Sequence, residues 1–255
     1  MLDRFLKPAV LPVVAGMATM PTRSATAPLA IASIVDQVER LHLYLDKFDE
    51  VPDYARHPKI RIHRSQDHAD LRANGKFVGL VEENEPVLFL GIDDDNRYPA
   101  DYAGRMSEAA RRYRYRRVVG VHAANLRKKK FKSILGAWLV VNRSEFLAED
   151  MDADLLGTDS VAFSTGRLRF DSGLWTTRNM CDLTFAFEAK RRGLRMTAIA
   201  RGANWVQCLE EGQADSIFAA LKKDDSRQTE LARILFADGR LDRGEAARIC
   251  GAPVD

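Results

Sequence analysis

The chain has 255 residues, of which 46% are hydrophobic and 29% charged, so it can bury a full core and has the composition of a globular protein. Its 39 basic and 36 acidic residues leave a net charge of +3, which is too small to predict a nucleic-acid partner. Three cysteines without metal-ligand spacing exclude a disulfide framework and, with no apolar stretch long enough to span a bilayer, predict a cytoplasmic protein.

The first half of the chain alternates between strand-like and helix-like segments. We expect strands at 10–16, 41–45, 59–63, 87–92 and 118–122. We expect helices at 28–38, 76–84 and 99–116, the first because its apolar residues recur at helical spacing. This alternation predicts an α/β fold with a mostly parallel central sheet flanked by helices.

The second half is less regular. We expect an extended segment at 160–164, a helix at 183–192, a strand at 196–200 and a charged, helix-prone tail. These patterns predict a single domain over residues 1–210 and a helical C-terminal extension over 211–255 that packs on it. Trp175 lies in a polar loop, where a large aromatic ring can stack on a sugar.

Three consecutive carboxylates, Asp93, Asp94 and Asp95, follow the apolar run 87–92. Ligands of open α/β sheets bind beyond the carboxyl ends of the strands, which is where these side chains should lie. Mg²⁺ and Mn²⁺ prefer oxygen ligands, so the segment predicts a metal site. The alternative is an acidic turn in which Asp95 or Asn96 caps the following helix.

An ordered series of segments surrounds this motif. In chain order they are Thr19-Met20-Pro21-Thr22-Arg23, Asp46, the Asn74-Gly75 segment of 67–77, Asp93-Asp94-Asp95, Leu156 to Phe163, and Asn179 to Leu183 with 188–194. Over roughly residues 10–205 the chain resembles nucleotide-diphospho-sugar glycosyltransferases of the GT-A fold. Its late acidic motif is similar to that of family-2-like inverting members. Cys181 departs from the pattern, because many relatives carry Glu before the aspartate.

The resemblance implies a donor site built from several of these segments. The nucleotide and diphosphate would be contacted by Thr19, Pro21, Arg23, Asp46, Asp70, Asn74, Lys76, Asp93 and Asp94. Mn²⁺ or Mg²⁺ would be held by Asp93 and Asp95, with His122 at a strand end as an added ligand. The alternatives are an exposed surface cation for Lys76 and Arg23, and a structural role for His122.

Two aspartates compete for the role of general base. The resemblance implies that Asp182 takes the proton of the acceptor hydroxyl, although a carboxylate in the first turn of a helix is also stabilised there by the helix dipole. Asp159 in the Gly-Thr-Asp-Ser segment is the competing base, and its alternative is an Asx-type turn.

The implied function is metal-dependent transfer of a sugar, with inversion, from a nucleotide-diphospho-sugar. We expect a UDP-sugar donor and a glycan or lipid-linked saccharide acceptor, as in polysaccharide biosynthesis. The basic segment 127–132 would allow peripheral contact with the inner face of a membrane. The alternatives are a sugar-nucleotide-forming nucleotidyltransferase, whose Gly-rich phosphate loop is missing at 16–21, and a non-catalytic module that binds glycans or membrane surfaces.

Overall fold

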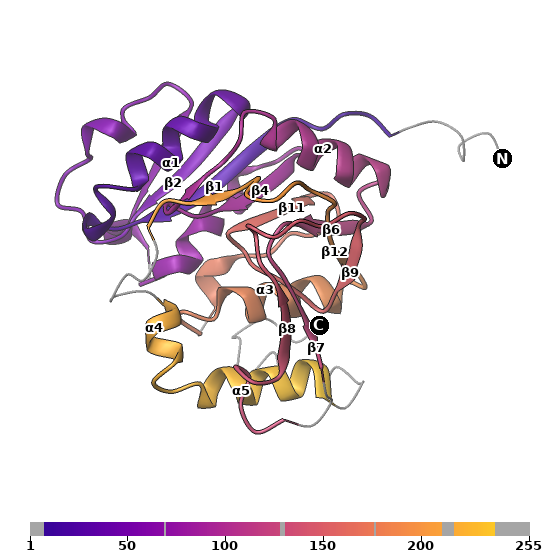
Figure 1. Cartoon of the computed structure of the whole chain (residues 1–255). Coiled ribbons are helices and arrows are strands. Elements are labelled where there is room, and N and C mark those ends of the chain that lie inside the picture. The colour runs from indigo at the N-terminus through magenta and orange to yellow at the C-terminus, as the bar shows by residue number, and fades with distance from the viewer. Residues whose placement is uncertain (1–7, 69, 128–130, 176, 211–216, 238–255) are drawn as a thin grey trace.

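A computed structural model describes residues 8–68, 70–127, 131–175, 177–210 and 217–237. Its central sheet has eight strands in the order β3-β2-β1-β4-β11-β6-β12-β9 (Figure 1). The strands are β1 (Val13–Thr19), β2 (Arg40–Leu45), β3 (Ile60–Arg64), β4 (Leu88–Ile92), β6 (Arg117–Gly120), β9 (Met151–Ala153), β11 (Ser160–Ser164) and β12 (Arg195–Ala198). β1 to β4 are parallel, whereas β11 is antiparallel to both β4 and β6. The predicted α/β fold with a mostly parallel sheet is therefore confirmed.

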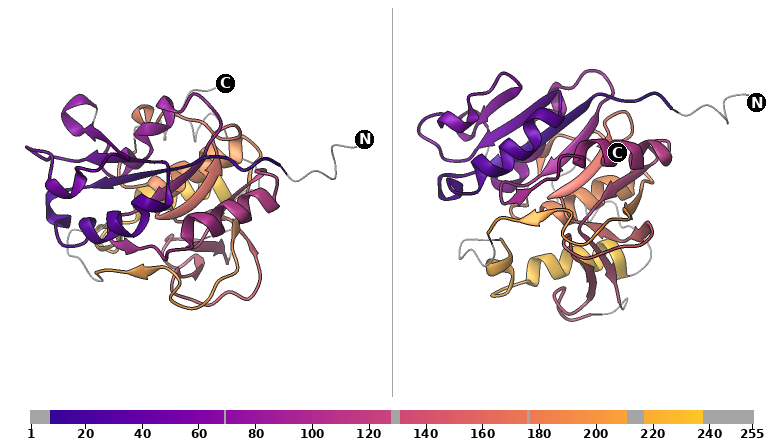
Figure 2. Two further views of the ribbon diagram at one scale, coloured as in Figure 1. Left: turned by 90° about the horizontal axis from the view of Figure 1, so that it is seen from above. Right: turned by 45° about the horizontal axis from the view of Figure 1, so that its top comes forward.

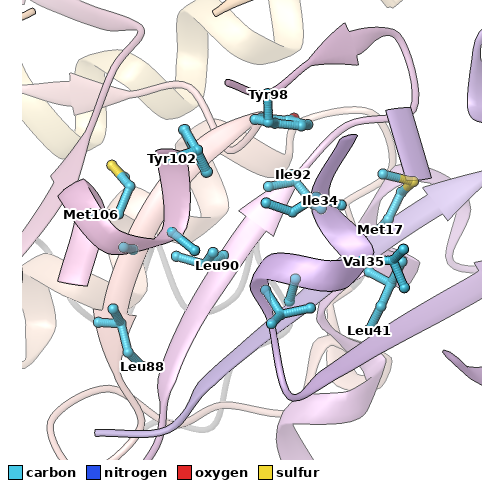
Figure 3. Close-up of a cluster of buried hydrophobic side chains, with 14 of the residues drawn as sticks. Met17, Ile34, Val35, Leu41, Leu88, Leu90, Ile92, Tyr98, Tyr102 and Met106 are labelled. Atoms are coloured by element: carbon cyan, nitrogen blue, oxygen red, sulfur yellow. The ribbon is translucent and has the colours of Figure 1, made fainter. Parts of the chain in front are cut away.

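Helices cover both faces of this sheet (Figure 1 and Figure 2). α1 (Ala27–Ile34) and α2 (Tyr102–Arg112) lie on one face, and α3 (Cys181–Arg191) and η6 (Arg72–Glu82) lie on the other. Side chains of β4 alternate between the two: Leu88, Leu90 and Ile92 pack toward α1 and α2 (Figure 3), and Phe89 packs toward η6. The strand is buried on both faces, which explains its continuous apolar sequence.

Aromatic side chains fill the core beneath η6 and α3. Phe77 stacks on Phe185 with ring centroids 5.6 Å apart, and Phe170 stacks on Trp175 at 4.9 Å. Trp175 is only 5% exposed, so the expectation that it stacks on a sugar is wrong. The loop that carries it folds back over the apolar face of the sheet, and burying the ring there is favourable.

Glycines bring η6 unusually close to the sheet. Gly16 and Gly91 are partners across β1 and β4, and a Cβ at Gly16 would lie 1.9 Å from the carbonyl oxygen of Lys76. On η6 itself, a Cβ at Gly75 would meet the ring of Tyr44, and one at Gly79 would meet the ring of His42. A Cβ at Gly91 would instead meet Thr158 and Val161 first, so we call Gly16, Gly75 and Gly79 the glycine seam. They let backbone, rather than side chains, form the contact between η6 and the sheet.

Smaller elements extend from this frame. They are the sheet β10 (Leu155–Leu156)-β7 (Ala123–Leu126)-β8 (Trp138–Val141), the pair β13 (Gln207–Cys208)-β5 (Asn96–Arg97), helices α4 (Ile217–Leu221) and α5 (Ser226–Ala232), a π turn at Arg233–Ala237, and 3₁₀ turns at Pro21–Arg23, Val35–Gln37, Asp53–Ala55, Ser65–Asp67 and Ser172–Leu174. Leu231 and Leu235 pack with Leu183 and Phe187 of α3. The described part of the tail thus packs on the domain, while 211–216 and 238–255 lie outside the described residues. The division of the chain at residue 210 stays a prediction.

The strand expected at 10–16 is Val13–Thr19, and the helix expected at 28–38 ends at Ile34 before a 3₁₀ turn. Larger differences occur in three further places. The helix expected at 76–84 is a run of 3₁₀ turns, Arg72–Glu82, whose two glycines lie against rings of β2. The helix expected at 99–116 ends at Arg112, because the chain then turns through positive φ angles at Arg114 and Tyr115. The short strands between 123 and 156 were not expected. Within the described residues, no helix has the length and apolar character needed to cross a bilayer.

Candidate functional site

The three aspartates form a turn at the carboxyl end of β4. Tyr98 holds this turn in place: its hydroxyl accepts a hydrogen bond of 2.8 Å from the backbone N–H of Asp93 and donates one of 2.8 Å to the carbonyl oxygen of Asp159. The Tyr98 ring is buried, so burial raises its pKa and keeps the hydroxyl protonated. The turn after β4 is thereby fixed to the segment that precedes β11.

A buried cation from η6 reaches the same place. Lys76 is 2% exposed, and its ammonium group forms an ion pair with the carboxylate of Asp93. Burial would lower the pKa of Lys76, but the charges of Asp93 and Asp182 outweigh it and raise the pKa above its ordinary value. Lys76 is therefore charged, and the alternative of an exposed surface cation is wrong for it. The gap at Gly16 is what allows η6 to deliver this side chain.

A second cation comes from a segment that the sequence analysis did not single out. Arg143 Nε lies 2.9 Å from Asp159 Oδ2, and its Nη1 donates a 2.7 Å hydrogen bond to Asn96 Oδ1. The charges of Asp159 and Asp95 raise the pKa of Arg143. Arg143 follows β8 in a stretch without periodicity or motif, so no signal in the sequence marked it.

The two candidate bases have different surroundings. Asp182 lies in the first turn of α3, and its Oδ1 accepts hydrogen bonds from Thr158 N (2.8 Å) and Thr158 Oγ1 (2.7 Å). Burial raises the pKa of Asp182. Burial acts the same way on Asp159, but Arg143, His122, Ser160 and Lys76 together outweigh it and lower the pKa. Ser160 Oγ donates a 2.9 Å hydrogen bond to Asp159 Oδ1. Asp159 is thus held in ion and hydrogen bonds through both oxygens.

The carboxylates of Asp93, Asp95, Asp159 and Asp182, together with Lys76 and Arg143, act on one another electrostatically. We call these six residues the aspartate cluster. Burial and the charge of Asp93 raise the pKa of Asp95, so two cations do not fully compensate four carboxylates. Oxygen donors that carry excess negative charge fit a hard divalent cation. Asp93 and Asp95 as its ligands stay a prediction.

Asp94 faces a different group of residues. It is buried, and burial raises its pKa to about 7, against the effects of the Thr19 hydroxyl and the Arg23 charge. Arg23 lies in the 3₁₀ turn that the exposed Pro21 begins directly after β1. The structure thus brings together Asp94, Thr19 and Arg23, which the sequence analysis assigned to the nucleotide and diphosphate, and that assignment stays a prediction.

The other expected donor contacts lie along the end of β2 and the start of η6. Asp46 follows β2 and is 5% exposed; its Oδ1 has no hydrogen-bond partner in the described part of the chain, and burial raises its pKa. Asp70 instead forms ion pairs with Arg178 and Arg72. Asn74 Nδ2 donates a 2.8 Å hydrogen bond to the carbonyl oxygen of Thr177.

These contacts tie the 70–74 segment to the segment that leads into α3. The buried Oδ1 of Asp46 can still accept a hydrogen bond from a ligand. Donor-binding roles for Asp46, Asp70 and Asn74 stay predictions.

His122 lies beside Asp159 at the end of β6. Its backbone N–H donates to Ser160 Oγ at 3.1 Å, and its buried Nδ1 has no hydrogen-bond partner among the described residues. A metal-binding role for it stays a prediction. A compact group of candidate metal ligands lies elsewhere, at His42, His63 and Glu82. Of the basic segment 127–132, residues 128–130 lie outside the described residues.

Neither a protein-family model nor a curated protein sequence matches the chain. Among solved structures, the chain is similar to GalNAc-T7 in complex with UDP, GalNAc and Mn²⁺, with a TM-score of 0.53 and 10% sequence identity. The match covers 82% of this chain and 46% of that one, so the chain spans about half the length of this neighbour. A structure of apo UDP-glucose pyrophosphorylase matches with a TM-score of 0.42, 8% identity and coverage of 77% and 92%, which is too weak to carry an argument. The comparison shows the fold, which is GT-A-like.

Proposed function

We propose that this chain is a metal-dependent glycosyltransferase that moves a sugar from a nucleotide-diphospho-sugar, with UDP as the expected nucleotide, to a saccharide acceptor. One observation carries the proposal. Carboxylates from three distant segments, at 93–95, 159 and 182, gather with the buried Lys76 beyond the carboxyl end of β4. Ligands of open α/β sheets bind at this edge. The GT-A-like fold supports the same reading.

The leaving diphosphate requires positive charge. Lys76 supplies a fixed ammonium group that is held against Asp93, and it lies within electrostatic reach of Asp182. A divalent cation held by Asp93 and Asp95 would stabilise the charge that develops on the diphosphate. Arg23 lies in the turn after β1 and within electrostatic reach of Asp94, where its guanidinium can contact the nucleotide side of the donor.

The acceptor hydroxyl requires a base. The two hydrogen bonds from Thr158 fix the orientation of the Asp182 carboxylate and leave its second oxygen to approach the hydroxyl. A pKa raised by burial makes this carboxylate a better proton acceptor. Asp159 fits the role less well, because Arg143 and Ser160 engage both of its oxygens. We therefore assign the base to Asp182 and a positioning role to Asp159.

Calorimetric titration with UDP, in Mn²⁺ and in chelator, tests the donor site. We expect binding that requires Mn²⁺ and that weakens at least tenfold in Asp95→Asn, because one charged ligand of the cation is lost. Asp36→Asn is the matched control, since Asp36 is an exposed carboxylate that precedes β2 at the opposite end of the sheet. Binding that ignores both Mn²⁺ and Asp95→Asn would contradict the proposal.

A screen of UDP-sugars then identifies the reaction by its products. Release of UDP with transfer to a saccharide supports the glycosyltransferase. Release of pyrophosphate from a nucleoside triphosphate and a sugar phosphate would assign the nucleotidyltransferase reaction instead. A binding module would retain glycan binding when Asp93, Asp95 and Asp182 are all changed to Asn, and would turn over no donor.

A further inference from the structure

Two histidines meet on the sheet face that η6 covers, away from the aspartate cluster. His42 lies on β2 and His63 on the neighbouring parallel strand β3, where His63 is the register partner of Tyr44. His42 Nδ1 and His63 Nε2 are 2.9 Å apart. The residues are 1% and 6% exposed. Two imidazole nitrogens therefore converge on one point inside the protein.

The ring of His42 is fixed on three sides. Its Nε2 forms a 2.8 Å hydrogen bond with Glu83 Oε1, and Arg40 forms an ion pair with the same carboxylate. Backbone of η6 lies on the ring, since a Cβ at Gly79 would be 2.1 Å from its Cγ, and Phe89 stacks on it with an interplanar angle of 21°. Histidines that bind a metal usually donate their other ring N–H to a carboxylate in this way. Nδ1 of His42 is thus the nitrogen left to face His63.

An acidic side chain completes the group on its solvent side. Glu82 lies next to Glu83 at the end of η6, its side chain is 34% exposed, and its Oε1 lies 3.8 Å from His63 Nδ1. One ligand atom each of His42, His63 and Glu82 lies within 4.8 Å of the others. The exposed His68 has its ring centroid 6.0 Å from that of His63. The group therefore has two buried nitrogen donors, one carboxylate and access from solvent.

We propose that His42, His63 and Glu82 bind a first-row transition-metal ion, with Zn²⁺ as the best fit. Two imidazoles and a carboxylate form a donor set that suits Zn²⁺, whereas Mg²⁺ and Mn²⁺ prefer oxygen ligands. In tetrahedral coordination two nitrogens at the usual bond length lie about 3.3 Å apart, so the pair must open slightly from 2.9 Å. The facing nitrogens lie on the line between ring centroids 5.1 Å apart, so both rings must also turn for their lone pairs to meet at the ion. Water or His68 would take the fourth position.

Metal binding requires a lone pair on each of the two facing nitrogens. In the metal-free protein His63 carries its ring proton on Nε2 and donates it to His42 Nδ1 across the 2.9 Å contact. That proton can move to Nδ1 of His63, the other nitrogen of the same ring, which faces Glu82. His42 keeps its proton on Nε2, where Glu83 accepts it. Both rings thereby stay neutral while they coordinate the ion.

The test uses the full chain with Asp95→Asn, which disables the predicted carboxylate metal site and keeps the buried ion pair between Lys76 and Asp93. Titration with Co²⁺ should give one tetrahedral site per chain with visible absorption, and calorimetry should show Zn²⁺ binding at the same stoichiometry. Because the donor site is disabled, this result is independent of the proposed transferase activity. No saturable binding of either ion would overturn the proposal.

Two variants in this background locate the site. His63→Gln should weaken Zn²⁺ binding by about 100-fold or more, because it removes a ligand. Glu82→Gln changes a partly exposed side chain, so it preserves the fold and should weaken binding by about tenfold or more. His57→Gln is the control, since His57 lies before β3 and outside the cluster. Unchanged affinity in Glu82→Gln, with the control also unchanged, would overturn the proposal even if His63→Gln failed to fold.

Discussion

Two polar clusters each contain a side chain from η6, Lys76 in one and Glu82 in the other, and they differ in how their charges are balanced. In the first, the aspartate cluster, four carboxylates share two cations. The second is a chain of six residues in which acidic and basic groups are neighbours, in the order Arg40, Glu83, His42, His63, Glu82 and Arg61, which we call the histidine chain.

The two clusters differ in charge balance, and this difference bears on where a cation is expected to bind. Each carboxylate of the histidine chain has its own arginine, so the chain is electrically complete without a bound ion. In the aspartate cluster, burial and then the charge of Asp93 raise the pKa of Asp95, and four carboxylates face only two cations. Burial of unbalanced charge is costly, and functional sites are where proteins tolerate that cost. We therefore expect the charge of the aspartate cluster to favour a bound cation, whereas at the histidine chain it is the arrangement of the ligand atoms that favours one.

The largest effect is expected from Asp182→Asn in the aspartate cluster. The amide keeps the shape of the side chain but cannot accept the acceptor proton, so kcat should fall by about 10²–10⁴. UDP affinity should stay within about threefold of wild type, because Asp182 contacts Thr158 and not the predicted metal ligands. Parallel measurements of sugar transfer and UDP binding check this. Undiminished sugar transfer would show that Asp182 is not the base, and would contradict a catalytic role for the aspartate cluster.

Asp94 at the edge of the aspartate cluster should make stability depend on pH. Its pKa rises from 3.8 to about 7 on burial, so the folded state holds the proton longer than the unfolded state does. Above pH 7 the charged form costs folding a few kcal/mol, roughly 2–4, and this cost disappears as pH falls from about 7 toward 4. Asp94→Asn should therefore raise the free energy of unfolding at pH 8 by about that amount. Urea denaturation at pH 8 and pH 5 measures it, and an equal change at both values would contradict the assignment.

Gly79→Ala tests the contact on which the histidine chain depends. The new methyl group would lie 2.1 Å from Cγ of His42, so η6 or the ring must move, at an expected cost of about 2–3 kcal/mol. Gly104→Ala is the matched control: nothing lies within 4 Å of its added Cβ, and in the first turn of α2 it should stabilise by about 0.5–1 kcal/mol. Thermal denaturation compares the two. Equal effects of both substitutions would contradict the close contact between Gly79 of η6 and the ring of His42.

The histidine chain should respond to pH in the opposite direction from Asp94. Burial lowers the pKa of His63 from 6.5 to about 4, so on acidification the unfolded chain takes up the proton first. Stability is then complete above about pH 6.5 and is lost as pH falls toward 4, by about 1–2 kcal/mol after allowance for solvent screening. His63→Gln should remove this loss and His57→Gln should not. Denaturation at pH 7 and pH 5 in both variants separates this contribution from that of Asp94.

Much of the frame could be predicted from the sequence because it depends on local patterns. Buried strands such as β4 and β11 are short apolar runs, and the aspartates that end β4 stand out by their charge. The alternation in Leu41-His42-Leu43-Tyr44-Leu45 is typical of a strand with one solvated face, yet η6 buries that face as well. A local sequence pattern cannot predict which distant segment will cover a given face of a sheet.

The rest of the site depends on contacts between distant segments. Lys76 is followed by Phe77 in a segment that resembles an ordinary helix. Its burial accompanies the close approach of the η6 backbone to Gly16, which no local pattern predicts. Arg143 is brought to Asp159 by strands too short to have a period of their own. Tertiary packing rather than propensity decides such positions.

The glycine seam has a mechanical consequence. Side chains at an interface can absorb small displacements by changing rotamers, but a backbone that lies directly on rings and strands has no such freedom. Gly75 and Gly79 lie on either side of the Lys76–Phe77 pair, and the acidic end of η6 holds His42 and His63. We therefore expect η6 to respond to a displacement as one unit, so that a substitution which moves its Gly79 end should also shift the Lys76 ammonium group.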